Sequence, residues 1–347
     1  MFENEKIKVM VVNDSLLMRI HLSELIMSSS HLIVGDTARD GVEALAKIKR
    51  NKPDVILTDL EMPNMDGFTF IQNLAKDDTL IPIIVVSSYG HESAKLVFDS
   101  LEVGALDFVT LPIKEENLPQ FKEILIQKIE IAARSNPSLL IPQKILNIKP
   151  VKKIKEKAGT ASKVVIIGAS TGGPRVLYEL FSNLPSDLNA GVLIIQHMPP
   201  GFTNKFAQRL DGISRLKITE ARDGDPILEG TCMVAPGDYH MLVEPSHCVV
   251  LNQSQKRFGV RPAINMSMIT AAETYGPNTI GVLLTGMGQD GAFGMKMIKK
   301  RGGYTIAQDE TTSVVYGMAK AAKELESVDK MLPINKISDE IVRLVNA

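Results

Sequence analysis

The stretch VVIIGASTGG, residues 164–173, constrains the fold more than any other part of the chain. Its opening apolar run is typical of a strand that is buried on both faces of a parallel sheet. Glycines then break the run, and Pro174 suits the first helical turn because its missing N–H costs nothing there. The spelling around Ser170 fits the G-x-S-x-G turn that exposes a nucleophilic serine. It would equally suit a phosphate-binding loop at a helix N-terminus.

The length of 347 residues is natural for two domains. Strand and helix patterns alternate over residues 5–133 and again over 162–347, which predicts two α/β domains with doubly wound parallel sheets. Residues 134–161 between them contain helix-breaking prolines and four clustered lysines, Lys152, Lys153, Lys155 and Lys157. This composition indicates a solvated linker, although its charge could also contact nucleic acid or an acidic partner.

Composition excludes several classes of protein. The net charge of −1 gives no overall attraction to nucleic acid or to a membrane surface. No apolar stretch approaches the roughly 20 residues of a membrane-spanning helix, and the N-terminus does not resemble a signal peptide. The two cysteines, Cys232 and Cys248, lack metal-ligand spacing and are expected to be reduced thiols. We therefore expect a cytoplasmic protein.

Polar residues follow the predicted strands of the first block, at the edge of the sheet where ligands bind. They are Asn13, Asp14, Asp59, Ser87 and the pair Thr110-Leu111. Carboxylates that converge from two neighbouring strands make an oxygen-only site suited to Mg²⁺. Each residue alone could instead be a helix cap or a turn former.

The segments VVNDSLLMR, DLEMPNMDG, VVSS and GALDFVT resemble the receiver domain of response regulators, a flavodoxin-like fold. The resemblance implies that Asp59 accepts a phosphoryl group, that Asp14 and Asp59 bind Mg²⁺ and that the Ser87 hydroxyl is the switch residue. Two residues depart from that pattern: Asn13 replaces an acid and Leu111 replaces a lysine. Both departures should weaken metal binding or phosphoryl transfer, so a degenerate receiver with little or no phosphorylation stays open.

In the second block, Ser170, His197 and Asp290 each directly follow a separate buried strand. Serine is a weak nucleophile until an imidazole takes its proton, and the imidazole needs a carboxylate to fix its tautomer. Each residue also has a purely structural interpretation: Ser170 as a helix cap, His197 as a core histidine and Asp290 as a turn former. The order Ser–His–Asp differs from that of the α/β-hydrolases, so a convergent triad on another doubly wound sheet is favoured. A phosphate loop is disfavoured because the Walker lysine is missing.

The segments IGASTGG, QHMPPGFTNKFAQRL, APGDYHM, RPAIN, LTGMGQDGAFGM and TIAQDE resemble the catalytic domain of the CheB family of chemotaxis methylesterases, a Rossmann-like fold. The resemblance implies that Ser170 is the nucleophile, His197 the general base and acid, and Asp290 the residue that orients His197. It also assigns the backbone N–H of Met287 to the oxyanion and places Thr171 beside the nucleophile. A glycine turn, Gly286–Gly288, permits the close approach that an oxyanion donor needs.

The family resemblance implies hydrolysis of glutamate methyl esters, and deamidation of glutamines, on methyl-accepting chemotaxis receptors. Catalysis would need no cofactor, and a CheA-type histidine kinase would be the phosphodonor. Small departures at Val260, Ala263 and Ala319 affect only the expected fit of the substrate. The alternative is a regulatory or scaffold protein with a phosphorylation-independent receiver. A DNA-binding response regulator would need a basic recognition helix after the linker, and the sequence offers none.

Overall fold

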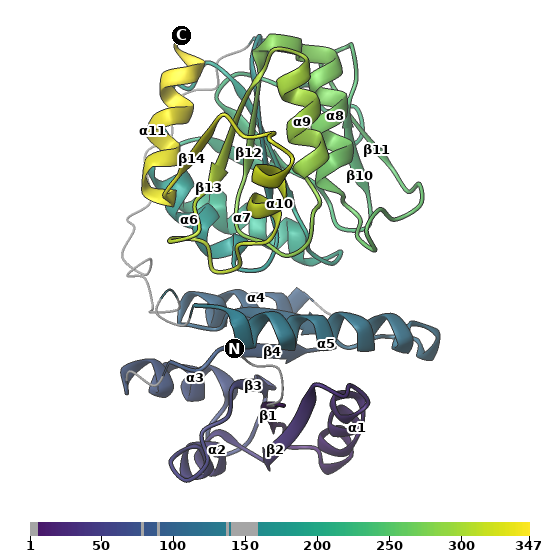
Figure 1. Cartoon of the computed structure of the whole chain (residues 1–347), viewed down its shortest axis with the longest axis vertical. Helices are drawn as coiled ribbons and strands as arrows, with labels where there is room; N and C mark the ends of the chain where they lie inside the picture. Colours follow the sequence, from purple (N-terminus) through teal and green to yellow (C-terminus); the bar gives the residue numbers. More distant parts are fainter. Residues whose placement is uncertain (1–5, 78–79, 89–90, 137–138, 140–158) are drawn as a thin grey trace. The chain divides into compact units, whose positions relative to one another are not determined.

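The computed structural model describes residues 6–77, 80–88, 91–136, 139 and 159–347 (Figure 1). The chain divides into two compact units, Met1–Lys144 and Ile145–Ala347. The four clustered lysines of the predicted linker lie outside the described residues, so their role stays a prediction.

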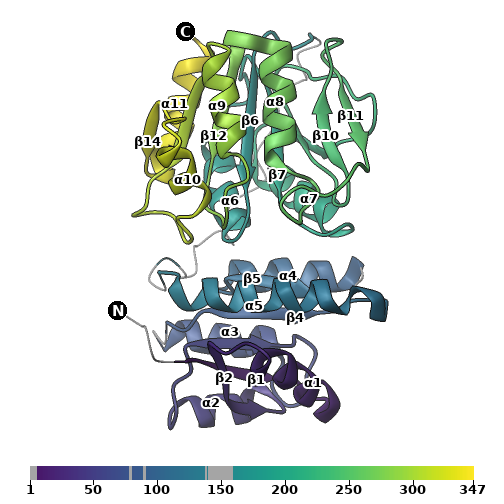
Figure 2. The same ribbon diagram turned by 45° about the vertical axis from the view of Figure 1, so that its right-hand side comes forward.

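The first unit contains a five-stranded parallel sheet in the order β2-β1-β3-β4-β5. Its strands are β1 (Ile7–Val12), β2 (Leu32–Ala38), β3 (Val55–Thr58), β4 (Ile83–Ser87) and β5 (Asp107–Thr110). Its helices are α1 (Leu16–Met27), α2 (Gly41–Ile48), α3 (Gly67–Lys76), α4 (His91–Glu102), the short 3₁₀ helix η1 (Glu115–Asn117) and α5 (Leu118–Arg134). Helices α1 and α5 cover one face, and α2, α3 and α4 cover the other (Figure 2). This strand order confirms the predicted flavodoxin-like fold.

The second unit contains a seven-stranded parallel sheet in the order β14-β13-β12-β6-β7-β9-β8. Its strands are β6 (Val164–Ala169), β7 (Gly191–Gln196), β8 (Lys217–Glu220), β9 (Thr231–Val234), β12 (Thr279–Leu283), β13 (Tyr304–Gln308) and β14 (Lys330–Leu332). An antiparallel hairpin, β10 (His240–Val243) and β11 (Val249–Asn252), stands apart from it. The Rossmann-like parallel sheet is as the sequence predicts.

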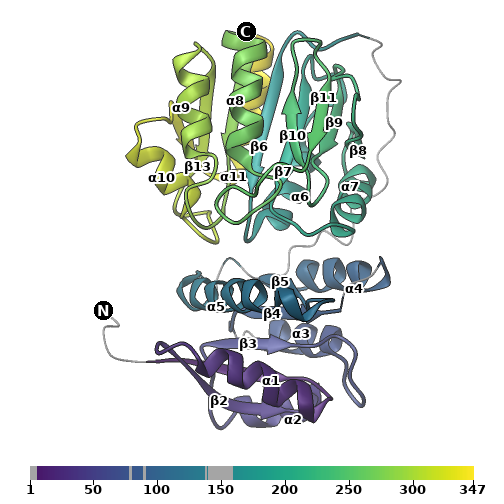
Figure 3. The same ribbon diagram turned by 90° about the vertical axis from the view of Figure 1, so that its right-hand side faces the viewer.

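Helices cover both faces of this sheet (Figures 1 and 3). They are α6 (Gly173–Asn183), α7 (Phe202–Ile213), α8 (Ile264–Tyr275), the 3₁₀ helix η4 (Gly276–Asn278), α9 (Ala292–Lys300), α10 (Met318–Glu324) and α11 (Ile334–Val345). Helices α8, α9 and α10 pack on one face, and α6, α7 and α11 pack on the other. Strand β6 is buried along its whole length, with side chains such as Ile166 packing in one core cluster with Met268 of α8. Burial on both faces explains why its sequence is a continuous apolar run.

Strand β6 lies at the centre of the sheet, with β7 on one side and β12 on the other. The chain leaves β6 toward β7 and later crosses back to β12, which makes a topological switch point beside β6. In open α/β sheets the ligand crevice lies at such a point, beyond the carboxyl ends of the strands. Ser170, His197 and Asp290 follow β6, β7 and β12 there.

Some details of the sequence prediction were wrong. The edge strand β14 was not predicted because three partly exposed residues carry too little pattern. The apolar spacing of α1 predicts one buried face of Met18, Leu22, Leu25 and Ile26, but only Leu22 and Ile26 are buried, whereas Met18 and Leu25 are half-buried. Both cysteines are free, as expected, but only Cys232 is fully buried.

Candidate active site

The turn from β6 to α6 holds Ser170 in a fixed backbone conformation. Its N–H donates to the carbonyl of Thr285 at 3.0 Å, and its carbonyl accepts from Gly173 N at 2.7 Å and from Gln196 Nε2 at 3.0 Å. Gly286 lies so close that a Cβ atom there would be 2.7 Å from the Cβ of Ser170. The sequence thus needs a glycine at this position because two strand-end loops meet over the serine.

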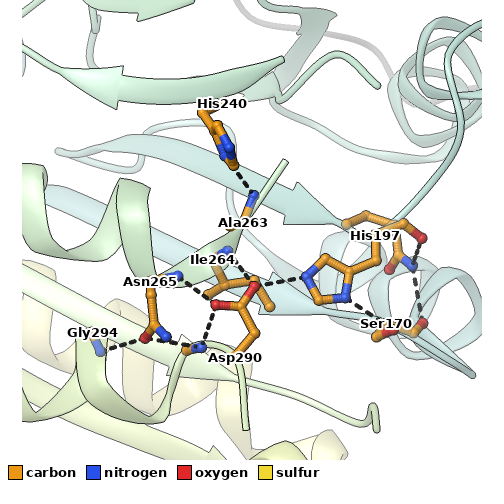
Figure 4. Close-up of polar contacts among 10 residues, drawn as sticks. Ser170, His197, His240, Ala263, Ile264, Asn265, Asp290 and Gly294 are labelled. Atoms are coloured by element: carbon orange, nitrogen blue, oxygen red, sulfur yellow. Dashed lines mark hydrogen bonds and ion pairs between the residues drawn. The ribbon is translucent and has the colours of Figure 1, made fainter. Parts of the chain in front are cut away.

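His197 lies between Ser170 and Asp290 (Figure 4). Its Nδ1 is 3.2 Å from Ser170 Oγ, and its Nε2 is 2.9 Å from Asp290 Oδ2. A carboxylate can only accept, so the ring carries its proton on Nε2 and presents the Nδ1 lone pair to the serine hydroxyl. This is the tautomer that a general base for Ser170 needs, with the two ring nitrogens in exchanged roles relative to the serine-protease template.

Asp290 is 2 % exposed and fully hydrogen-bonded. Besides His197, its Oδ2 accepts from Ile264 N at 2.7 Å, and its Oδ1 accepts from Asn265 N at 2.9 Å and from Gly291 N at 3.0 Å (Figure 4). Burial alone would raise the pKa of Asp290, but the bond from His197 and the backbone N–H groups outweigh it and hold the pKa below its usual value. The carboxylate therefore stays ionised beside the imidazole.

The first unit has a second cluster, around Asp59 at the end of β3. One oxygen of Asp59 accepts from Asn13 Nδ2 at 2.7 Å, and the other accepts from the N–H groups of Leu60 at 2.6 Å and Glu61 at 3.3 Å. Burial raises the pKa of Asp59, and those backbone N–H groups offset part of that rise. Asp14 is exposed beside it.

Asn13 turns its amide nitrogen, and not its amide oxygen, toward Asp59. Its Oδ1 accepts from Ser15 N at 2.9 Å, and its amide nitrogen faces Asp59. Ser87 is buried, and its hydroxyl donates to its neighbour's carbonyl, while Leu111 donates its N–H to the Ser87 carbonyl at 2.9 Å. Over the described residues, no group of three or more His, Cys, Asp or Glu is placed to hold a metal ion.

Comparison with known proteins assigns a family to each of the two units. A family model described as CheB methylesterase matches residues 165–341, and one described as response regulator receiver domain matches residues 9–122. A protein-glutamate methylesterase/protein-glutamine glutaminase of Pyrococcus abyssi is 44% identical, covering 98% of this chain and 94% of the relative. The chain belongs to the CheB family.

Other relatives extend the similarity to the CheB family. A protein of the same description from Symbiobacterium thermophilum is 40% identical over 98% of this chain and 97% of its own length. The crystal structure of the Thermotoga maritima CheB methylesterase catalytic domain is 44% identical, with a TM-score of 0.51, and covers 52% of this chain and 98% of that one. None of the helices that the structure describes is long and apolar enough to cross a membrane.

The loop after β12 contains two N–H groups, those of Gly286 and Met287, that differ in whether they already have a hydrogen-bond acceptor. The N–H of Gly286 already donates to the carbonyl of Val315 at 3.0 Å, so this member of the glycine turn is not free to bind an oxyanion. Met287 is 40% exposed, and its N–H bonds to no other described residue. Thr171 is buried next to the serine, and its carbonyl accepts from Thr285 Oγ1 at 3.0 Å.

Two buried amides that sequence reasoning missed hold the site together. Gln196 is 2 % exposed and donates to the carbonyls of Ser170 and His197, at 3.0 and 3.2 Å. Asn265 accepts from Gly291 N at 3.1 Å and from Gly294 N at 2.6 Å, which ties the start of α8 to the loop that carries Asp290 (Figure 4). Gln196 could have been noticed as the polar end of an apolar run, and Asn265 as the last residue of the RPAIN segment.

Proposed function

We propose that this protein hydrolyses glutamate methyl esters, and deamidates glutamine side chains, on methyl-accepting chemotaxis receptors in the cytoplasm. The hydrogen-bonded series Ser170–His197–Asp290 carries the proposal, because it lies at the switch point of the sheet and has the tautomer that acyl transfer requires. The relatives are described as protein-glutamate methylesterases/protein-glutamine glutaminases, which supports protein-bound glutamate esters and glutamines as the substrates.

In the first half-reaction, Ser170 Oγ attacks the γ-carbonyl carbon and His197 Nδ1 takes the hydroxyl proton. Asp290 holds the Nε2 proton and stabilises the imidazolium. The developing oxyanion accepts a hydrogen bond from the N–H of Met287, a 40% exposed residue whose N–H bonds to no other described residue. Collapse of the tetrahedral intermediate breaks the bond to the leaving group, and His197 returns the proton to it, releasing methanol from an ester or ammonia from an amide.

In the second half-reaction, water replaces the leaving group. His197 Nδ1 takes a proton from the water as it attacks the acyl-enzyme, and then returns that proton to Ser170 Oγ. The product is a free glutamate side chain from either substrate, so one site accounts for both activities. No step needs a metal or an organic cofactor.

We also propose that phosphorylation of Asp59 by a CheA-type histidine kinase controls this reaction, with residues 134–161 connecting the two domains. Asp14 and Asp59 are the carboxylates that would hold Mg²⁺, and the ion would neutralise phosphoryl oxygens during transfer. The amide nitrogen of Asn13 points at Asp59, and Leu111 supplies no cation. Both Mg²⁺ binding and phosphoryl transfer to Asp59 should therefore be weak.

The test is methanol release from a methylated receptor fragment, measured for the full chain with and without acetyl phosphate and Mg²⁺. We expect release from the wild type, none above background from Ser170→Ala, and a modest stimulation by the phosphodonor that Asp59→Ala abolishes. Release by Ser170→Ala at the wild-type rate would refute the proposed chemistry. A scaffold role is not favoured, because a scaffold has no need of the hydrogen-bonded triad.

A further inference from the structure

His240 is a buried histidine that the proposed reaction does not use. It opens β10, has 0 % exposure and makes two hydrogen bonds through its ring. Its Nε2 lies 3.2 Å from the carbonyl of Gln255, and its Nδ1 lies 3.2 Å from the backbone N–H of Ala263 (Figure 4). The carbonyl can only accept and the N–H can only donate, so these partners fix a neutral ring with its proton on Nε2.

The partner of His240 leads directly to the triad. Ala263 is the N-cap residue of α8, and its side chain makes no capping bond. The next two N–H groups, those of Ile264 and Asn265, hold the two oxygens of Asp290 at 2.7 and 2.9 Å. The position of the Ala263 backbone therefore sets where two of the four donors to Asp290 lie.

We propose that neutral His240 is a positioning residue for the triad: it anchors the Ala263 N–H and thereby aims the start of α8 at Asp290. The inference rests on the proposed role of the triad, and it adds a residue in another element of the fold. In this arrangement His240 never touches the substrate. It acts through one backbone bond on the carboxylate that orients His197.

The hairpin that carries His240 is attached to α8 by other bonds. Ser267 Oγ donates to the carbonyl of Met241 at 2.5 Å, and Thr270 Oγ1 accepts from Val243 N at 3.0 Å. These bonds keep β10 docked on α8 when the ring at position 240 is changed. Loss of the His240 bond should therefore disturb the helix start without detaching the hairpin.

Protonation of His240 would remove the anchor, because Nδ1 would then carry a hydrogen that points at the Ala263 N–H. Burial lowers the pKa of His240, the Gln255 bond and Asp290 oppose that shift, and Arg257 and Arg261 add to it. The ring is thus neutral at pH 7 and gains its proton only in acid. The acid limb of log kcat/KM should accordingly be steeper, by up to one unit of slope, than in a variant that lacks this ring.

The test uses the full chain and p-nitrophenyl acetate, a small ester whose hydrolysis does not depend on recognition of a receptor. His240→Leu removes the acceptor, and we expect kcat to fall about 10- to 100-fold with little change in KM, because a small misplacement of catalytic groups has effects of this size. His240→Asn places an amide oxygen near the Nδ1 position and should restore kcat to within a few-fold of the wild type. His247→Asn, in the turn of the same hairpin, is the control and should match the wild type, because its ring packs on Tyr275 at the opposite end of α8 from the donors to Asp290.

The pH profile separates positioning from a merely structural role. For the wild type we expect the acid limb of log kcat/KM to steepen from a slope of one to a slope of two, whereas His240→Asn should keep a slope of one. Equal slopes of log kcat/KM in acid for the wild type and His240→Asn would overturn the proposal. A folded His240→Leu with kcat within twofold of the wild type would also overturn it. If His240→Leu fails to fold, the acid slopes of the wild type and His240→Asn are sufficient to test the proposal. Failure of receptor hydrolysis with these results intact would count against the substrate and not against His240.

Discussion

Replacing Asp290 by Asn tests how far the carboxylate's hydrogen bonds control the triad. The substitution keeps the shape of the side chain but turns one of its two acceptors into an NH₂ group, which only donates. Four donors now point at this carboxylate: His197 Nε2 and Ile264 N at Oδ2, and Asn265 N and Gly291 N at Oδ1. The amide cannot accept from all four.

The amide has two orientations, and each has a distinct cost. If NH₂ faces Asn265 and Gly291, two buried N–H groups lose their acceptor, which costs about 2–6 kcal/mol at about 1–3 kcal/mol each. If NH₂ faces His197, the ring must carry its proton on Nδ1 and cannot accept the proton of Ser170. The corresponding change in serine proteases lowers kcat about 10⁴-fold, equal to about 5.5 kcal/mol in the barrier.

Both costs can be measured on one preparation. We expect Asp290→Asn to lose about 10³- to 10⁴-fold in kcat for p-nitrophenyl acetate, or else to unfold several kcal/mol more easily in urea, depending on the orientation that the amide takes. Asp187→Asn, at an exposed carboxylate of the same domain, is the matched control and should change neither. An Asp290→Asn variant with wild-type stability and more than a tenth of wild-type kcat would refute this reasoning.

Three further predictions concern other parts of the chain. Asn13→Asp replaces the amide that donates to Asp59 at 2.7 Å with a carboxylate, so Mg²⁺ should bind about tenfold more tightly or better by isothermal titration calorimetry; unchanged affinity would argue against a receiver weakened at this position. Gly286→Ala would put a Cβ 2.4 Å from Met318 Cε and 2.7 Å from Ser170 Cβ. We expect kcat to fall about 100-fold because the serine must shift, and a variant with wild-type kcat would show that the loops can move apart freely. Glu340→Gln removes a carboxylate whose pKa is about 2, below the usual 4.5, because of hydrogen bonds and charge from Arg343 and Lys330. That stabilisation is complete above pH 4.5 and is lost as the pH falls through about 2. In urea melts the variant should be about 1 kcal/mol less stable at pH 7, discounted for the exposure of the two cations, and the difference should vanish in strong acid; a difference that is independent of pH would contradict this assignment.

The sequence predicted the sheets well because buried parallel strands leave a strong signal. The apolar runs of β6, β7 and β12 end at turn residues, and strand ends of a parallel sheet meet at one edge. That rule alone brought Ser170, His197 and Asp290 together before any geometry was known. The edge strand β14 and the half-exposed face of α1 are harder to predict, because a short or outward-facing segment has little hydrophobic periodicity.

The residues that support the triad were harder to predict for a physical reason. Asn265 and His240 act on Asp290 through backbone N–H groups that come close only when α8 docks on the sheet and the hairpin docks on α8. Composition and spacing do not encode such contacts. Asn13 shows the same limit: an asparagine can present oxygen or nitrogen, and only its neighbours, Ser15 and Asp59, decide which one faces the acid.

The most direct test of the account is to look for the acyl-enzyme. The protein is mixed with p-nitrophenyl acetate, quenched in acid within the first turnovers and mapped by peptide mass spectrometry. The account predicts an acetyl group on Ser170 in the wild type and no acetylation at that peptide in Ser170→Ala, with hydrolysis lost in the same variant. An acyl group on another residue, or steady turnover by Ser170→Ala, would contradict it.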